Sequence, residues 1–185
     1  MNGMAKGMEV VGRKYQEGEY FLPELLMAAE TFKEGMSIFG PRLKSSSPSS
    51  RARVVIGTVE GDLHDIGKNI VSVLLEASGF EVFDLGVDVP AARFTDKAKE
   101  VSADVIAMSA LLTTTFPQMK QVIEANRKSG AETKTLVGGA PLSEDVAKSI
   151  GADGYGRDAV EGATICKQWS AGKHNSPHSG KLDEN

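Results

Sequence analysis

The sequence predicts an α/β fold, a doubly wound parallel sheet of the Rossmann-like (flavodoxin-like) type that follows an N-terminal helical segment. From residue 52 onward, short apolar runs alternate with stretches of helical periodicity. Parallel strands need such crossover connections, and the helices then cover both faces of the sheet. A chain of 185 residues is long enough to bury a core of this kind.

Residues 1–43 predict two amphipathic helices. Apolar residues first recur at spacings of three and four, and the sequence "EGE" at 17–19 interrupts this pattern before it resumes. The two runs consist of Met4, Met8, Val11 and Tyr15, and then of Leu22, Leu25, Ala29, Phe32 and Met36. Residues 44–51 are rich in serine and contain Pro48, which is typical of a linker.

The sheet domain is expected over residues 52–170. Strands are predicted at 52–58, 80–86, 103–110, 133–139 and 152–156, where β-branched and other apolar residues form short runs. Helices are predicted between them at 67–77, 91–102, 116–130 and 143–150, and a last helix at 158–170. Residues 171–185 are polar and contain proline, glycine and serine, so we expect a disordered tail in which His174 and His178 serve no site.

The composition narrows the possible partners. The formal net charge of -4 argues against nucleic-acid binding, which needs a clustered positive field. The single cysteine, Cys166, cannot form an internal disulfide, and the chain has no signal-like or membrane-spanning apolar run. We therefore expect a cytoplasmic protein that binds small molecules or other proteins.

In an open parallel sheet, ligands bind at the carboxyl ends of the strands. The loop after the first strand, "GTVEGDLHDIGKN", places His64 just before a helix that Asp65 can cap. A lone histidine in a loop is often no more than hydrogen bonded there. Asp62, however, could accept the N–H of the imidazole, which is the arrangement that orients a metal-bound histidine.

A zinc site is not expected, because the ordered part of the sequence offers only His64 and Cys166 as nitrogen or sulfur ligands. A metal that brings its own macrocycle needs only one protein ligand, which favours a tetrapyrrole-type cofactor with an axial imidazole. The glycine patterns of dinucleotide and phosphate-binding loops are absent from this turn. The acidic pair of a response-regulator receiver is missing after the first strand as well.

Three motifs together resemble the cobalamin-binding domains of methionine synthase and of corrinoid proteins from methylamine and methanol methyltransferase systems. "GDLHDIGKN" contains the pattern DxHxxG as Asp62, His64 and Gly67. "MSALLTTT" is similar to the SxL segment of that family, and "LVGGAP" is similar to its paired glycines. The segment "GMEVVGRKYQEGEYFLPELLMAAE" resembles the helical cap that precedes the domain, so the similarity extends from about Met4 to Ser170.

The resemblance implies that a corrinoid, methylcobalamin or a related cobalt compound, binds with its lower base detached and its nucleotide tail threaded into the sheet domain. His64 would be the lower axial cobalt ligand, Asp62 would accept its N–H, and the hydroxyl of Thr115 would stand behind the aspartate. Phe21 would cover the upper face of the corrin, with help from Leu22, Leu25 and Met27. The remaining cofactor-binding residues that the resemblance indicates are Asp65, Ile66, Gly67, Ser109, Leu111, Thr113, Gly138 and Gly139.

The function implied by the resemblance is that of a carrier subunit, which shuttles a methyl group from a substrate-specific methyltransferase to an acceptor methyltransferase. The cap of the family is a four-helix bundle, whereas residues 1–43 hold two helices and thus a partial cap. Two amphipathic helices should leave an apolar stripe unburied, and we expect it to pair with a second copy or with a partner enzyme.

Two other functions are compatible with the DxHxxG pattern. One is the small subunit of an adenosylcobalamin-dependent mutase, and the segment around Phe21 argues against it because such subunits usually lack the cap. The other is a non-catalytic cobalamin sensor or storage protein. Light-responsive sensors of that kind carry a helix-turn-helix module, which is not found before the cap segment.

Overall fold

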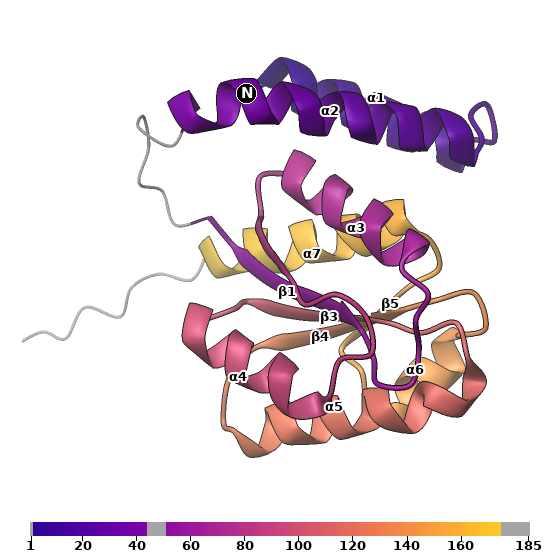
Figure 1. Cartoon of the computed structure of the whole chain (residues 1–185), viewed down its shortest axis with the longest axis vertical. Helices are drawn as coiled ribbons and strands as arrows, with labels where there is room; N and C mark the ends of the chain where they lie inside the picture. Colours follow the sequence, from indigo (N-terminus) through magenta and orange to yellow (C-terminus); the bar gives the residue numbers. More distant parts are fainter. Residues whose placement is uncertain (1, 44–50, 175–185) are drawn as a thin grey trace, which may run out of the picture.

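The structure is a computed structural model that describes residues 2–43 and 51–174. Figure 1 shows its helices and strands in the order that the sequence predicts. They are α1 (Asn2–Gln16), α2 (Leu22–Leu43), β1 (Arg53–Thr58), α3 (Ile66–Ala77), β2 (Glu81–Asp84), α4 (Ala91–Val101), β3 (Val105–Ser109), the 3-10 turn η1 (Thr113–Thr115), α5 (Phe116–Lys128), β4 (Lys134–Gly138), α6 (Glu144–Ile150), β5 (Gly154–Gly156) and α7 (Ala159–His174).

The five strands form one parallel sheet with the order β2-β1-β3-β4-β5. This order is that of flavodoxin-like folds, in which the strand order reverses between β1 and β3. The expected fold class is therefore confirmed. The loops that follow β1 and β3 lie on the two sides of this reversal, which is where ligands bind in open α/β sheets.

Two apolar layers enclose the sheet. The side chains of β1 alternate between them, because Val54 and Ile56 face the core beneath α3 and α7, while Val55 faces the core beneath α4 and α5. In Figure 1, α3 and α7 cover one face of the sheet, α4 and α5 cover the other, and α1 with α2 form a further layer outside α3. The molecule thus has four layers, of which the helical pair α1 and α2 is the outermost.

The helices α1 and α2 bury most of their apolar stripe against the sheet domain. Met8, Leu25 and Phe32 are buried in the same core cluster as Leu75 and Cys166. The expectation that this stripe is left unburied is therefore wrong, because α3 and α7 cover it. Some apolar side chains of α2 remain outside this contact, among them Ile38, which is 68% exposed.

The C-terminal boundary differs from the expectation. Helix α7 continues to His174, so the first four residues of the expected tail are helical. The segment after Ser170 has no proline before Pro177, and nothing in its sequence stops the helix earlier. The rest of the expected tail, with His178, and the linker residues 44–50 lie outside the described residues.

Candidate functional site

The loop that joins β1 to α3 presents an aspartate and a histidine to each other. The Oδ1 atom of Asp62 lies 2.7 Å from Nδ1 of His64 and accepts the backbone N–H of the same residue at 3.0 Å. The backbone carbonyl of His64 in turn accepts the hydroxyl of Thr58 at 2.8 Å. The main chain and the ring of His64 are therefore both fixed by neighbours from the end of β1.

Asp62 also joins this loop to the loop after β3. Its second oxygen, Oδ2, accepts the backbone N–H of Leu111 at 2.6 Å and that of Leu112 at 3.1 Å. The side chain is fully buried. Burial by itself would raise the pKa of the Asp62 carboxyl, but the hydrogen bonds that the carboxylate accepts together hold this pKa below its ordinary value.

The ionised state of Asp62 determines the tautomer of His64. A carboxylate can only accept hydrogen bonds, so the proton of the neutral imidazole must be on Nδ1. The lone pair of Nε2 is then free to bind a metal, and the side chain of His64 is 54% exposed. His64 can therefore act as a metal ligand that is oriented from behind by a carboxylate.

The surface around His64 is apolar. Leu63 and Ile66, which flank the histidine, are exposed, and so are Leu111 and Leu112 on the neighbouring loop. Large exposed apolar side chains in one place usually mark a binding surface. A flat, mostly apolar ligand with a metal at its centre fits this combination of an imidazole with four apolar neighbours.

A cavity of about 250 Å³ lies between helices α2, α3 and α7 and the carboxyl ends of β3 and β4. Part of its wall is backbone, because five glycines line it: Gly67, Gly138, Gly139, Gly156 and Gly162. We call this cavity the glycine slot. It also includes Ser109, together with Leu22 and Leu25 from the N-terminal helical pair.

Gly139 could not be replaced by a larger residue without a change in the backbone. Its φ is +141°, and a Cβ atom added to it would lie 1.8 Å from the carbonyl oxygen of Ala110. A Cβ atom on Gly138 would lie 3.3 Å from the carbonyl oxygen of Gly156. The closeness of these backbones keeps the end of β4 narrow and leaves room for a ligand beside it.

Two sequence-based expectations about side chains are wrong. The hydroxyl of Thr115 donates to the carbonyl of Leu112 at 2.8 Å and not to Asp62, whose oxygens are occupied by amides and by His64. Thr115 supports Asp62 only through the turn that carries Leu112. Asp65 stands at the N-cap of α3, but its side chain makes no capping hydrogen bond and instead accepts Nδ2 of Asn69 at 3.2 Å.

The other expected residues fall into two groups. Gly67, Ser109, Gly138 and Gly139 line the glycine slot. Ile66 is the first residue of α3, Leu111 follows β3, and Thr113 begins η1. Phe21 and Met27 do not line the slot. Phe21 precedes α2, where its backbone N–H donates to Oε2 of Glu24 at 2.9 Å, and its side chain is 68% exposed.

Sequence reasoning missed a buried lysine next to the slot. The ammonium group of Lys68 is paired with the carboxylate of Asp84 at the end of β2 and donates to Oδ1 of Asn69 at 2.6 Å. The side chain is only 3% exposed. A lysine in the first turn of a helix, on the same face as the apolar positions, is the signal that could have indicated it.

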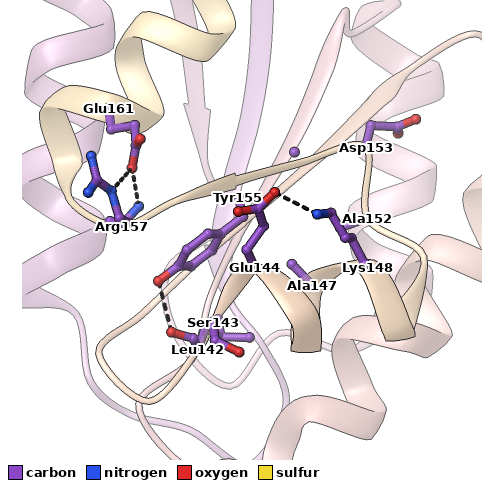
Figure 2. Close-up of a pocket in the computed structure, with 11 residues that line it drawn as sticks. Leu142, Ser143, Glu144, Ala147, Lys148, Ala152, Asp153, Tyr155, Arg157 and Glu161 are labelled. Atoms are coloured by element: carbon purple, nitrogen blue, oxygen red, sulfur yellow. Dashed lines mark hydrogen bonds and ion pairs between the residues drawn. The ribbon is translucent and has the colours of Figure 1, made fainter.

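A second and larger cavity, of about 620 Å³, borders β5 and α6 (Figure 2). Four of its charged side chains form two pairs, Lys148 with Glu144 at 2.7 Å and Arg157 with Glu161 at 2.9 Å. The carboxylate of Asp153 accepts the hydroxyl of Thr135 at 2.8 Å. The hydroxyl of Tyr155 donates to the carbonyl of Leu142 at 2.8 Å. No residue of the loop that carries His64 lines this cavity, so we do not consider it the functional site.

The described residues offer no complete set of protein ligands for a metal ion. In residues 2–43 and 51–174, no group of three or more His, Cys, Asp or Glu side chains could hold a metal ion. A metal at His64 therefore needs further ligands of its own. The fold, the glycine slot and the oriented imidazole are together compatible with one class of protein, the α/β domains that could hold a metal macrocycle through one histidine.

Residues 52–164 match a family model described as a B12 binding domain, and residues 1–39 match a second model with the same description. A corrinoid protein of Desulfitobacterium hafniense (strain Y51) is 47% identical over 168 residues, which are 86% of this chain and 78% of that protein. The chain belongs to this family of B12-binding corrinoid proteins.

Two further relatives extend the comparison. A dimethylamine corrinoid protein of Methanosarcina acetivorans is 45% identical over 169 residues, which cover 90% of this chain and 79% of that protein. The solved methanol:cobalamin methyltransferase complex of Methanosarcina barkeri contains a chain of 34% identity and a TM-score of 0.81. That match covers 92% of this chain and 66% of the other.

Among the described residues, no helix has the length and apolar character needed to cross a bilayer.

Proposed function

We propose that this chain is the methyl-carrying corrinoid subunit of a methyltransferase system. The observation that carries the proposal is the pair formed by Asp62 and His64, which leaves Nε2 free among exposed apolar side chains and beside the glycine slot. The names of the dimethylamine and methanol relatives support methyl transfer as the purpose of the corrinoid. The chain is then a carrier that works between enzymes.

When bound, the corrinoid supplies a cobalt centre that accepts a methyl group and gives it up. His64 would offer Nε2 to the cobalt, and Asp62 keeps the proton on Nδ1 so that this lone pair stays available. The apolar side chains of Leu63, Ile66 and Leu111 exclude water from the face of the macrocycle. The glycine slot, with Ser109 and Gly139 in its wall, would hold the nucleotide tail.

The binding part of the proposal is tested by mixing the purified chain with methylcobalamin, desalting it, and recording the visible absorption spectrum. The wild-type protein should retain a corrinoid that is histidine-ligated. The variant His64→Ala should retain less corrinoid or hold it without a lower protein ligand. A wild-type protein that retains no corrinoid, or a His64→Ala variant with an unchanged spectrum, would contradict the role of His64.

The carrier role requires two protein partners, a methyltransferase that loads the corrinoid and one that unloads it. The solved Methanosarcina barkeri relative lies in a methyltransferase complex, which supports partners of this class. Affinity capture from native cells, with the bound proteins identified by mass spectrometry, tests it. Recovery of a methyltransferase is expected, whereas recovery of a mutase large subunit would favour the adenosylcobalamin alternative.

We place this methyl exchange in the cytoplasm, where a lone thiol such as Cys166 stays reduced.

We also propose that the exposed side of α2 pairs with a second copy or with the partner enzyme. Ile38 and Phe39, both exposed, lie near the end of α2. Sedimentation analysis of the wild-type protein and of Ile38→Glu tests the self-pairing form. A dimer that becomes monomeric in the variant is expected, and a dimer that Ile38→Glu leaves intact would refute pairing through this surface.

A further inference from the structure

Asp88 stands out in the loop between β2 and α4 because of its backbone conformation. Its φ is +54°, and the only other non-glycine residue with a positive φ in the described part of the chain is Ser102. Ser102 is the C-cap of α4, where a left-handed residue commonly ends a helix. Asp88 ends no helix, and a strained residue without such a reason points to a function.

The contacts of Asp88 explain why this conformation is kept. Its Oδ1 atom accepts the backbone N–H of Gly61 at 2.7 Å, and its own backbone N–H donates to the carbonyl of Asp62 at 3.0 Å. Asp88 therefore holds both ends of the 61–62 segment. In the left-handed conformation one residue can direct its side chain and its amide to the same neighbouring segment.

Residues 61–62 determine the position of His64. Asp62 accepts both the ring N–H and the backbone N–H of His64, so a shift of Asp62 moves the imidazole with it. The loop after β3 binds the carboxylate of Asp62, and Asp88 binds the backbone carbonyl of Asp62. The two attachments come from opposite sides of β1, because the strand order is β2-β1-β3.

We propose that Asp88 is a positioning residue that sets the place of His64 relative to a bound metal. This inference rests on the proposed function of His64 as a metal ligand. Among the described residues, Asp88 forms its hydrogen bonds with Gly61 and Asp62 and does not line the glycine slot, so its loss should weaken the ligation by histidine without preventing the uptake of the corrinoid. The effect passes from Asp88 to Gly61 and Asp62, and from there to the imidazole.

Two substitutions separate the hydrogen bond from the backbone conformation. Asp88→Gly removes the acceptor but accepts a positive φ without strain, so the loop can keep its path. Asp88→Asn keeps an oxygen acceptor, and asparagine tolerates the left-handed region better than most residues. Asp88→Asn is thus the matched control, and thermal unfolding of both variants without corrinoid shows whether the fold is retained.

The experiment loads the full chain with methylcobalamin and follows two quantities, the amount of corrinoid bound after desalting and the histidine-ligated fraction in the visible spectrum. For Asp88→Gly we expect the same amount of bound corrinoid as for the wild-type protein. We expect the equilibrium constant for ligation by His64 to fall roughly tenfold, because a hydrogen bond to a charged acceptor is lost. Asp88→Asn should behave like the wild-type protein.

Three results would overturn the inference. The first is an Asp88→Gly variant that is ligated as fully as the wild-type protein, and the second is an Asp88→Asn variant that loses ligation as strongly as Asp88→Gly. These results leave the proposed function intact, because the wild-type protein remains ligated by His64. The third is a wild-type protein whose spectrum equals that of His64→Ala, which would overturn both proposals.

Discussion

Gly67→Ala should raise the stability of the chain without corrinoid and lower its affinity for corrinoid. Gly67 is the second residue of α3, and a Cβ atom added to it would meet nothing within 4 Å. Alanine in a helix is favoured over glycine by about 0.5–1 kcal/mol. For a domain of this size, that gain corresponds to an increase of roughly 1–4 °C in the melting temperature.

The loss of affinity comes from the position of Gly67 in the wall of the glycine slot. If a ligand packs against this backbone, an added methyl group overfills the site, at a cost of roughly 1–3 kcal/mol. The dissociation constant for methylcobalamin should then increase about 5-fold to 150-fold. Circular dichroism melting and equilibrium dialysis measure the two effects on the same preparation.

Gly7→Ala is the matched control for this prediction. Gly7 lies within α1, and a Cβ atom added there also meets nothing within 4 Å, but Gly7 does not line the slot. The control should gain stability and bind methylcobalamin like the wild-type protein. The reasoning is refuted if Gly67→Ala binds methylcobalamin as tightly as the control does, or if it melts below the wild-type protein.

Three further predictions concern titratable groups. The lowered pKa of Asp62 means that its contribution to stability is present above about pH 4 and is lost as the pH falls through the folded pKa; urea unfolding should show this acid loss, and Asp62→Asn should reduce it. Partial desolvation raises the pKa of Glu76, whose side chain stays exposed to solvent, so Glu76→Gln should be slightly more stable than the wild-type protein at pH 7, with a difference that shrinks toward about pH 4; an unchanging difference would contradict this. Burial raises the pKa of the Cys166 thiol to about 12, so a thiol reagent at pH 8 should label Cys166 only after urea unfolding, and rapid labelling of the folded chain would be inconsistent with its burial.

The sequence alone predicts those features that local pattern controls. The alternation of strands and helices follows from apolar periodicity, and the contact between Asp62 and His64 follows from their separation by two residues in one loop. The narrow end of β4 could be anticipated from the paired glycines, because only glycine permits such a close approach of backbones.

Other features depend on contacts that are distant in the sequence. The hydroxyl of Thr115 could have reached Asp62 or a nearer carbonyl, and the fold of the turn at 112–115 selects the carbonyl of Leu112. Lys68 finds its partner Asp84 sixteen residues away, across α3 and β2. The burial of Leu25 and Phe32 depends on the docking of α2 against the sheet domain, which helical periodicity does not specify.

The hydrogen bonds that Asp62 accepts from two loops affect the free energy of cofactor binding. Its carboxylate joins the loop after β1 to the loop after β3 through hydrogen bonds within the protein, so these loops are ordered when the chain folds. The conformational entropy of arranging the site is thus lost during folding and is not subtracted from the binding energy. Such preorganisation favours tight binding, because these two loops need not be ordered when the ligand arrives.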